Sequence, residues 1–321
     1  MKVLVTGGSG YVGTTLVPML LASGRQVTVL DCLLYGSDPA LGLKDRNGFF
    51  FVRGDIRERA AVESAARDCD AIVHLGAIVG LSACEKNPEL AGQTNVLGSQ
   101  NVAAIASGRP LIYASTGSCY GIVKDALCTE ETPLRPLSVY ARTKAQGEEA
   151  MLAAGATVFR IATAFGVSPR LRLDLLVNEF VHRAIHEKVL RLYEGSARRS
   201  FIDVSDIARA ICFALDHAAA MREQVYNAGN ERMNFTKMDI CRIIQARVGN
   251  VRIELDPAGH DPDQRDYAIA YGKLSALGYV TKVSMEQGID ALAVALRDIP
   301  DRRPYCNALA LQRDPGSGIR E

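Results

Sequence analysis

The feature that most constrains the fold of this chain lies at its start, where a glycine-rich turn joins two apolar runs. Residues 1–6 read MKVLVT, residues 7–13 read GGSGYVG, and an amphipathic stretch follows over 14–23. Residues 26–30, QVTVL, form the second apolar run, and Asp31 follows directly. This order of strand, glycine turn, helix, strand and acid is typical of a dinucleotide-binding unit.

Each glycine of the turn is expected to have its own task. Gly7 permits the tight turn, Gly10 lets a pyrophosphate approach the backbone, and Gly13 lets the helix lie close to the strand. The N-terminus of the helix then offers unpaired N–H groups and a partial positive charge to the phosphates. We therefore expect the turn to contact a dinucleotide through Gly7, Gly10, Tyr11, Val12 and Gly13.

Asp31 indicates which dinucleotide is bound. A carboxylate at the end of the second strand accepts hydrogen bonds from the ribose hydroxyls of NAD and repels the 2′-phosphate of NADP. No arginine follows at once, because the next residues read CLLY. Asp31 could instead merely cap its strand, but its position after the glycine turn favours the cofactor role. NAD is the expected cofactor.

Composition and charge exclude several classes of protein. The chain has 321 residues, 48% of them apolar, and no run long enough to cross a membrane. Its 37 basic and 36 acidic residues give no general attraction to nucleic acid or to a membrane surface. Because a strand follows Met1-Lys2 at once, we expect no signal peptide and a cytoplasmic location. The eight cysteines show neither a CxxC pair nor metal-ligand spacing, so we expect reduced thiols and no metal site.

Strand-like and helix-like stretches alternate through the first half of the chain. The expected strands include 49–52, 71–74, 111–115 and 157–161, and the expected helices include 60–68, 88–107 and 140–154. Repeated β-α-β units with apolar strands predict an α/β fold with a Rossmann-type, doubly wound parallel sheet.

The organisation of the chain changes after about residue 165. We expect an NAD-binding domain over 1–165 and a smaller C-terminal α+β lobe over 166–298 that binds substrate, with strands that can interleave with the first domain. Residues 299–321 contain DRRP and DPGSG, and we expect them to form a flexible tail.

A catalytic pair is expected where the helix over 140–154 begins. Tyr140 and Lys144 are four residues apart and so share one helical face. A lysine beside a tyrosine, together with a positively charged nicotinamide, favours the phenolate, so we expect a lowered pKa for Tyr140. Such a pair is common on surface helices, but here a strand ends at Ser115-Thr116, at the edge where α/β sheets bind ligands. Together these groups can remove a proton from a sugar or alcohol oxygen while hydride leaves the carbon.

Residues 1–295 resemble the extended short-chain dehydrogenase/reductase family, and within it the NAD-dependent nucleotide-sugar epimerases and dehydratases. Besides the glycine turn, Tyr140 and Lys144, the resemblance rests on the segments GDI at 54–56, HLGA at 74–77, NVLG at 95–98 and ASTGSCYG at 114–121. It implies that Thr116 is the catalytic hydroxyl beside Tyr140 and Lys144. It also implies further cofactor contacts through Asp55, Ile56, Leu75, Ala77, Asn95, Ser115, Tyr140 and Lys144.

The resemblance also implies a nucleotide-diphosphate sugar as the substrate. It assigns Asn178, Arg199 and Arg265 to the diphosphate and neighbouring ribose, and guanidinium groups suit phosphate because they bind it in bidentate fashion. Ser118 and Glu85 are further expected substrate contacts, on the catalytic strand and in the loop after the strand at 71–74.

Two positions after Thr116 depart from the 4,6-dehydratases of the family. Those enzymes carry Asp and then Glu there, whereas this chain has Gly117 and Ser118. Glycine cannot act as an acid, and serine is a poor base without a partner. The departure favours chemistry at C4 of the sugar, and so a 4-epimerase that acts on a hexose or heptose through a transient 4-keto sugar, with Tyr140 as base.

Several alternatives stay open on the sequence. The same residues suit an NDP-sugar 4-dehydrogenase or ketoreductase, and a 4,6-dehydratase remains the third member of this group. A non-catalytic NAD(H)-sensing protein belongs to another class, but such relatives usually lose the tyrosine or the lysine. By analogy with the family, we expect a homodimer through the helices over 88–107 and 140–154.

Overall fold

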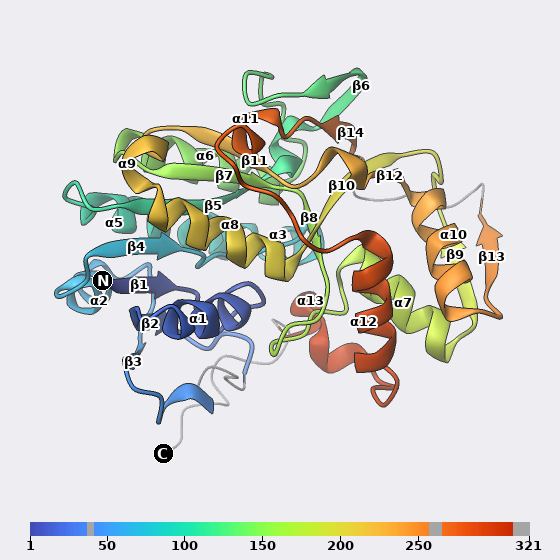
Figure 1. Cartoon of the computed structure of the whole chain (residues 1–321), viewed down its shortest axis with the longest axis horizontal. Helices are drawn as coiled ribbons and strands as arrows, with labels where there is room; N and C mark the ends of the chain where they lie inside the picture. The colour runs from blue at the N-terminus through green and yellow to red at the C-terminus, as the bar shows by residue number, and fades with distance from the viewer. Residues whose placement is uncertain (37–41, 257–264, 311–321) are drawn as a thin grey trace.

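A seven-stranded parallel sheet forms the centre of the molecule (Figure 1). The computed structural model describes residues 1–36, 42–256 and 265–310. Every pairing within this sheet is parallel, which confirms the predicted Rossmann-type fold. In spatial order the strands are β11 (Val225–Ala228), β7 (Thr157–Ile161), β5 (Leu111–Thr116), β4 (Ala71–His74), β1 (Lys2–Thr6), β2 (Gln26–Asp31) and β3 (Phe49–Arg53).

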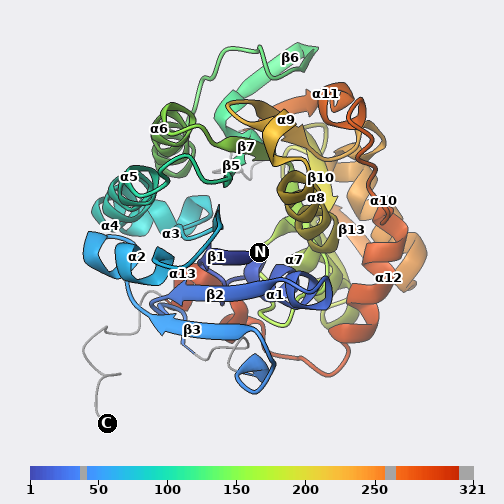
Figure 2. The same ribbon diagram turned by 60° about the vertical axis from the view of Figure 1, so that its left-hand side comes forward.

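Helices cover both faces of the sheet, because its strands are apolar on both sides (Figure 2). On β1, Val3 and Val5 pack into the cluster of α1 (Gly13–Ala22) and α8 (Val204–Asp216). Leu4, between them, points to the opposite face and joins the other cluster. That face is covered by α2 (Arg59–Ala66), α5 (Gly98–Ala104) and α6 (Val139–Ala153).

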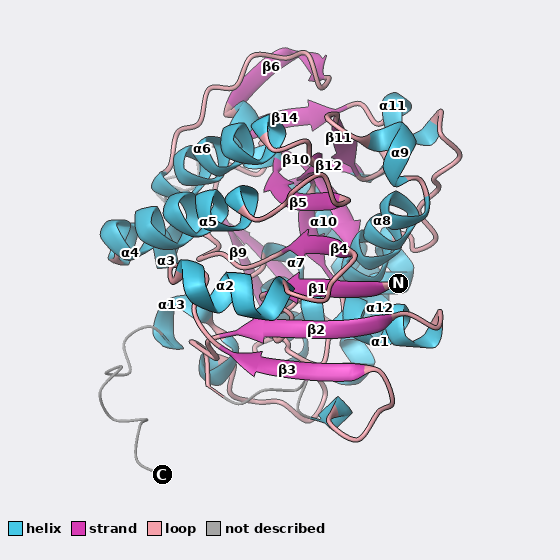
Figure 3. Ribbon diagram, turned by 90° about the vertical axis from the view of Figure 1, so that its left-hand side faces the viewer, coloured by secondary structure: helices cyan, strands magenta, loops and turns pink. Residues whose placement is uncertain are grey.

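The strand order reverses beside β1, which has β2 on one side and β4 on the other. Figure 3 shows β2, β3, β4 and β5 running in one direction, toward the side where α3 (Leu81–Lys86) and α13 (Asn307–Ala310) lie. Loops that leave the two halves of such a sheet diverge at the reversal, and this opens a crevice at the carboxyl edge.

A second, smaller lobe lies beside this carboxyl edge and has its own apolar core. Its main helices are α7 (Leu176–His186), α10 (Lys237–Val248) and α12 (Met285–Ala295). Its strands pair as β8 (Thr163–Phe165), β10 (Arg198–Asp203) and β12 (Asn234–Thr236) in one small sheet, β9 (Val189–Leu192) with β13 (Arg252–Leu255), and β6 (Ile122–Cys128) with β14 (Asp266–Ile269). The second half also supplies β11 and α8 to the large domain, so the two parts interleave along the chain.

The helix expected over 88–107 is divided by a π-helical turn. It consists of α4 (Pro88–Gly92), a π turn at Gln93–Leu97 and α5. Asn95 lies on this turn, and its carboxamide binds both backbone groups of Ile78, with Ile78 N at 2.8 Å and Ile78 O at 3.0 Å. The π turn therefore carries Asn95, whose side chain holds the loop after β4.

Residues 301–310 differ from the expected flexible tail. They form a 3₁₀ turn at Arg303–Tyr305 and then α13, and Cys306 and Asn307 are buried. The rest of that segment, residues 311–321, lies outside the described residues. The remaining short elements are 3₁₀ turns at Gly117–Tyr120 and Glu231–Met233 and the helices α9 (Ala218–Met221) and α11 (Gly272–Ser275). Among the described residues, none of the helices has both the length and the apolar character that crossing a membrane requires.

Candidate active site

A cavity of about 760 Å³ opens at the carboxyl edge of the large sheet. It extends from the glycine turn, past the ends of β2 to β5, to the arginines of the smaller lobe. Most of the expected site residues line it, namely Gly7, Gly10, Tyr11, Val12, Gly13, Asp31, Asp55, Ile56, Leu75, Ala77, Ser115, Thr116, Ser118, Tyr140, Lys144, Arg199 and Arg265. Residues far apart in the sequence therefore meet around one space.

The glycine turn is packed so closely that side chains would not fit. A Cβ on Gly7, whose φ is +69°, would lie 2.6 Å from Gly76 N, and one on Gly13 would lie 2.5 Å from Gly8 O. Ser9 lines the cavity beside this turn, and its buried hydroxyl has no hydrogen-bond partner. A helix N-terminus with an unsatisfied hydroxyl beside it fits the pyrophosphate of a dinucleotide.

Two carboxylates line the end of the cavity formed by β2 and β3. Asp31 accepts hydrogen bonds from Ser9 N at 3.0 Å and Leu33 N at 2.9 Å, which hold its carboxylate at the rim of the glycine turn. Asp55 is bound by the Arg57 guanidinium at 2.6 Å. Burial opposes ionisation of Asp55, but the hydrogen bonds from Arg57 outweigh it and lower the pKa of Asp55. Both groups are placed to accept hydrogen bonds from an adenosine.

Thr116, Tyr140 and Lys144 meet at the centre of the cavity. Thr116 ends β5, and Tyr140 lies in the first turn of α6, where its phenol is close enough to the Thr116 hydroxyl for that hydroxyl to lower the pKa of the phenol. Lys144 lies one turn further along α6, and its ammonium is 3.9 Å from the centre of the Tyr113 ring. The predicted hydroxyl, phenol and ammonium are therefore brought to one place.

The protein by itself raises the pKa of Tyr140, whereas the expected lowering included the positive charge of the nicotinamide. Burial raises the pKa to about 12, and the nearby Thr116 hydroxyl offsets only part of that effect. Burial also lowers the pKa of Lys144 to about 7, because the ammonium loses its hydration. Burial therefore shifts both groups toward their neutral forms.

Buried polar groups behind the cavity fix the catalytic strand and helix. The carboxylate of Glu148 on α6 pairs with Arg160 of β7 at 2.7 Å, and the hydroxyl of Ser115 on β5 donates to the same carboxylate. His74 at the end of β4 binds Thr6 Oγ1 at 2.6 Å and Ser99 Oγ at 3.1 Å. These contacts tie β1, β4, β5, β7, α5 and α6 together.

Positive side chains converge on the opposite wall. Arg199 of β10 is 2% exposed, and its guanidinium donates to the Arg198 carbonyl oxygen at 3.1 Å. Arg265 hydrogen-bonds the hydroxyl of Ser118, which in turn accepts from Thr116 at 3.0 Å. The other cationic residues of this wall are Arg183, Arg191 and Lys237. Such a concentration of guanidinium groups suits a diphosphate.

Three expected ligand contacts are used inside the protein instead, and none of them lines the cavity. Asn95 is fully buried and holds the backbone of Ile78, as described above. Glu85 accepts a hydrogen bond from Val139 N at 3.0 Å and so satisfies a free N–H at the start of α6. Asn178 is also fully buried, and it accepts from Gly166 N at 3.0 Å and donates to Arg172 O at 2.9 Å.

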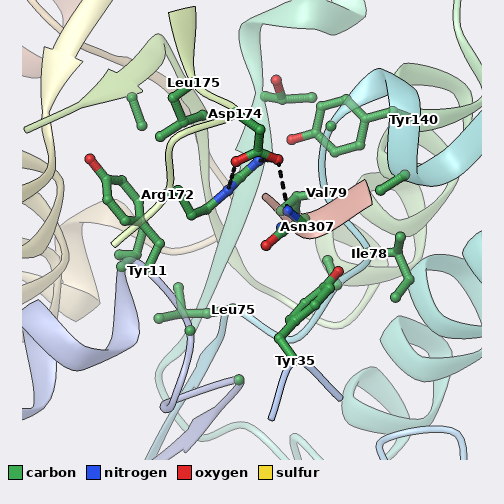
Figure 4. A pocket seen from close by; sticks show the side chains of 18 of the residues that line it. Tyr11, Tyr35, Leu75, Ile78, Val79, Tyr140, Arg172, Asp174, Leu175 and Asn307 are labelled. Carbon is green, nitrogen blue, oxygen red and sulfur yellow. Dashed lines mark hydrogen bonds and ion pairs between the residues drawn. The ribbon is translucent and has the colours of Figure 1, made fainter. Parts of the chain in front are cut away.

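The sequence interpretation missed a second polar group at the cavity, formed by the segment after β8 (Figure 4). Arg172 donates to both carboxylate oxygens of Asp174, at 3.0 and 2.9 Å. The Arg170 guanidinium lies 4.6 Å from the centre of the Tyr35 ring, and both residues line the cavity. The arginine-rich run RLRLD at 170–174 is the signal in the sequence, although the residues that it meets come from elsewhere in the chain.

Within the described residues, no group of three or more His, Cys, Asp and Glu side chains could hold a metal ion.

Comparison with known proteins agrees with this geometry. Residues 3–229 match the model of the NAD dependent epimerase/dehydratase family. The chain is 33% identical to the low-salt glycan biosynthesis protein Agl12 of Haloferax volcanii, over 91% of this chain and 97% of that protein. It is 30% identical to a dTDP-glucose 4,6-dehydratase of Streptomyces niveus, over 90% of each chain.

The solved structures include a similar epimerase. The UDP-glucose 4-epimerase of Thermus thermophilus, in complex with NAD, superposes with a TM-score of 0.80 at 28% identity, and the match covers 93% of this chain and all of that one. Fold, cavity, motifs and relatives agree, and the chain belongs to the NAD-dependent epimerase/dehydratase family of nucleotide-sugar enzymes.

Proposed function

We propose that this chain holds NAD along the glycine turn and catalyses the 4-epimerisation of a nucleotide-diphosphate hexose or heptose. The main support is the meeting of Thr116, Tyr140 and Lys144 in one cavity between the glycine turn and a wall of arginines. Asp31 and Asp55 are suited to the adenosine half of the cofactor. Arg199 and Arg265 are suited to the diphosphate of the substrate.

The chemistry assigned to the protein is proton transfer at the 4-hydroxyl of the sugar. Tyr140, as phenolate, takes the proton from this hydroxyl, and Thr116 holds the oxygen by a hydrogen bond. When bound, NAD supplies a reversible two-electron acceptor for C4. After the 4-keto sugar has turned its other face to the cofactor, the hydride that the cofactor would hold returns to C4 and Tyr140 returns the proton to the oxygen; delivery of hydride to that other face inverts C4.

Lys144 assists in its charged form. The ammonium favours the phenolate electrostatically, and the positive charge of the oxidised nicotinamide acts in the same direction. Because the pKa of Tyr140 is raised to about 12, mainly by burial, this additional charge is needed for the base to form near neutral pH.

The acidic side chains that line the cavity support the proposal of epimerisation and not of 4,6-dehydration. Loss of water requires a protonated acid near the sugar, and Gly117 and Ser118 supply none. Of the other described acids that line the cavity, Asp174 has a pKa that is lowered by Arg172 in spite of burial. Glu179 is paired with Arg302 at 2.7 Å and Arg183 at 3.0 Å. The Asp174 carboxylate is therefore suited to remain ionised and not to donate a proton.

The proposal is tested by incubating the purified protein with UDP-, GDP-, ADP-, CDP- and dTDP-sugars in deuterated water, without added cofactor. Sugar NMR and NADH absorbance are followed together. We expect inversion at C4, no solvent deuterium in the sugar, and no lasting NADH.

Other outcomes identify the alternatives. Accumulation of NADH with a 4-keto sugar would make the protein a 4-dehydrogenase. Deuterium at C6 with loss of water would make it a 4,6-dehydratase and would contradict the argument from Gly117 and Ser118. Full biological activity of a Tyr140→Phe variant would favour a non-catalytic NAD(H) sensor.

A further inference from the structure

We propose that Asn307, carried by the C-terminal segment, binds hydroxyl groups of a sugar ring in the cavity, together with the hydroxyl of Tyr35. This inference rests on the proposed function, since it names an additional binding residue at the same site. The segment concerned is residues 301–309, which follows the smaller lobe and returns to the carboxyl edge of the large sheet.

Hydrogen bonds hold this segment against two other parts of the chain. Leu173 N donates to the carbonyl oxygen of Tyr305 at 3.0 Å, and Asn307 N donates to Asp174 Oδ2 at 3.3 Å. From α3, Lys86 donates to the carbonyl oxygen of Ala308 at 3.2 Å. The segment therefore bridges α3 and the segment after β8, and both Asn307 and Ala308 line the cavity.

Asn307 presents a buried polar atom that has no partner in the protein. The residue is 1% exposed, and its Oδ1 atom makes no hydrogen bond. The hydroxyl of Tyr35, on the loop after β2, is also buried and without a partner. Figure 4 shows both side chains at the same cavity as Tyr140, around the Arg172–Asp174 pair. Buried polar atoms without partners are unfavourable, so two of them at one cavity indicate a polar ligand.

The chemistry of these groups selects a neutral ligand. A carboxamide and a phenol both donate and accept hydrogen bonds, as do sugar hydroxyls. The Arg172 guanidinium is neutralised by bidentate pairing with Asp174, and the Arg170 guanidinium lies over the face of the Tyr35 ring, 4.6 Å from its centre. The two atoms without partners are uncharged, and they are suited to the hydroxyl groups of a ligand.

Two ligands could supply these hydroxyls, the nucleotide sugar and NAD, whose riboses also carry hydroxyl groups. The experiment separates them by measuring KM for the nucleotide sugar and the dissociation constant of NAD in the same variants. NAD content after gel filtration is measured by absorbance, and this readout does not depend on turnover.

The variants are Asn307→Ala and Tyr35→Phe, with Leu309→Ala as the matched control. Leu309 lies on α13 with Asn307, is 39% exposed, and does not line the cavity. Tyr35→Phe removes only an oxygen atom, so it tests the inference even if Asn307→Ala disturbs the segment. Melting temperatures report the folding of each variant.

We expect each test variant to raise one of the two constants by about 3- to 10-fold, as loss of one hydrogen bond does, while the control matches the wild type. A rise in KM assigns the groups to the nucleotide sugar, and a rise in the NAD constant assigns them to a ribose of NAD. If both variants match Leu309→Ala in both constants, the inference is wrong. If the wild type acts on no nucleotide sugar, the proposed function fails, and the NAD constants alone decide whether Asn307 and Tyr35 bind a ligand.

Discussion

At the scale of single residues, burial controls the chemistry more strongly than the neighbouring charge does. Tyr140 and Lys144 have the spacing expected of a catalytic pair, yet the dry cavity shifts both pKa values toward the neutral forms. Cysteine thiols respond in the same way, since burial raises the pKa of Cys119 to about 12. If Tyr140 is the base, as proposed, the charge of a bound nicotinamide would oppose this effect of burial.

Replacement of Tyr140 tests its proposed role as the catalytic base. Tyr140→Phe should lower kcat by about 10²- to 10⁴-fold, because the phenol cannot be replaced as proton acceptor, while the NAD content stays unchanged. Tyr226→Phe is the control, since Tyr226 is buried in β11 and does not line the cavity. Retention of more than a tenth of the wild-type kcat by Tyr140→Phe would contradict the assignment.

His74 should make the folded state sensitive to acid. Burial, with a smaller contribution from Lys144, lowers its pKa well below 6.5, so folded His74 stays neutral where the unfolded chain takes a proton. The unfolded state then binds more protons below about pH 6.5, and the free energy of unfolding falls there by up to about 1.4 kcal/mol per pH unit. Stability is retained above that pH.

Urea unfolding of the wild type and of His74→Gln, from about pH 5 to about pH 7.5, measures this contribution. Glutamine can keep hydrogen bonds to Thr6 and Ser99 but does not titrate, so the variant should show the shallower pH dependence. If the free energy of unfolding changed with pH equally in the two proteins, His74 would not contribute to the acid sensitivity. His182, whose pKa is also lowered by burial, is present in both proteins and cancels in the difference.

At the scale of elements, the close approach of α1 to the glycine turn after β1 determines the shape of that turn, which is the expected NAD-binding segment. A Cβ on Gly13 would meet the Gly8 carbonyl at 2.5 Å, and this backbone contact cannot yield without moving the helix. Gly13→Ala should therefore lower the free energy of unfolding by about 1–3 kcal/mol and weaken NAD binding. Chemical denaturation and NAD titration measure the two effects.

Gly92→Ala is a matched control for this helix glycine. Gly92 ends α4 with helical dihedral angles, and an added Cβ would have no atom within 4 Å. Alanine should stabilise the protein there by about 0.5–1 kcal/mol, because it restricts the unfolded chain. If Gly13→Ala changes the free energy of unfolding as Gly92→Ala does, then the close contact with the Gly8 carbonyl is not the reason for glycine at position 13.

At the scale of the whole molecule, we propose a homodimer through α4–α5 and α6, as the family resemblance implies. Leu97, on the π turn between α4 and α5, is 44% exposed on the helices concerned. Sedimentation should give twice the mass of one 34.6 kDa chain. Leu97→Arg should weaken association by roughly 100-fold or more, since it would bury an unpaired charge.

The control for this prediction is Val294→Arg. Val294 lies on α12, in the smaller lobe, and is 69% exposed. It should leave the sedimentation unchanged. A wild-type protein that sediments as one chain would contradict the proposed interface.

The sequence interpretation was weakest for polar residues that serve structure. Asn95, Glu85 and Asn178 resemble ligand contacts of the family, but each satisfies backbone groups of loops or helix ends within this chain. A polar residue type and its position in a motif do not reveal which way the side chain points. Only the packing of the loop after β4 and of the segment after β8 decides that direction.

The sequence by itself determined the fold class, the glycine turn and the place of Thr116, Tyr140 and Lys144, because these depend on local spacing and on the period of apolar residues. Tertiary structure alone decided which further groups line the cavity beside Tyr140. Arg172, Asp174, Tyr35 and Asn307 come from three distant segments and have no shared pattern in the sequence. The pKa values likewise depend on how much water the folded cavity excludes, and no local run of residues specifies that.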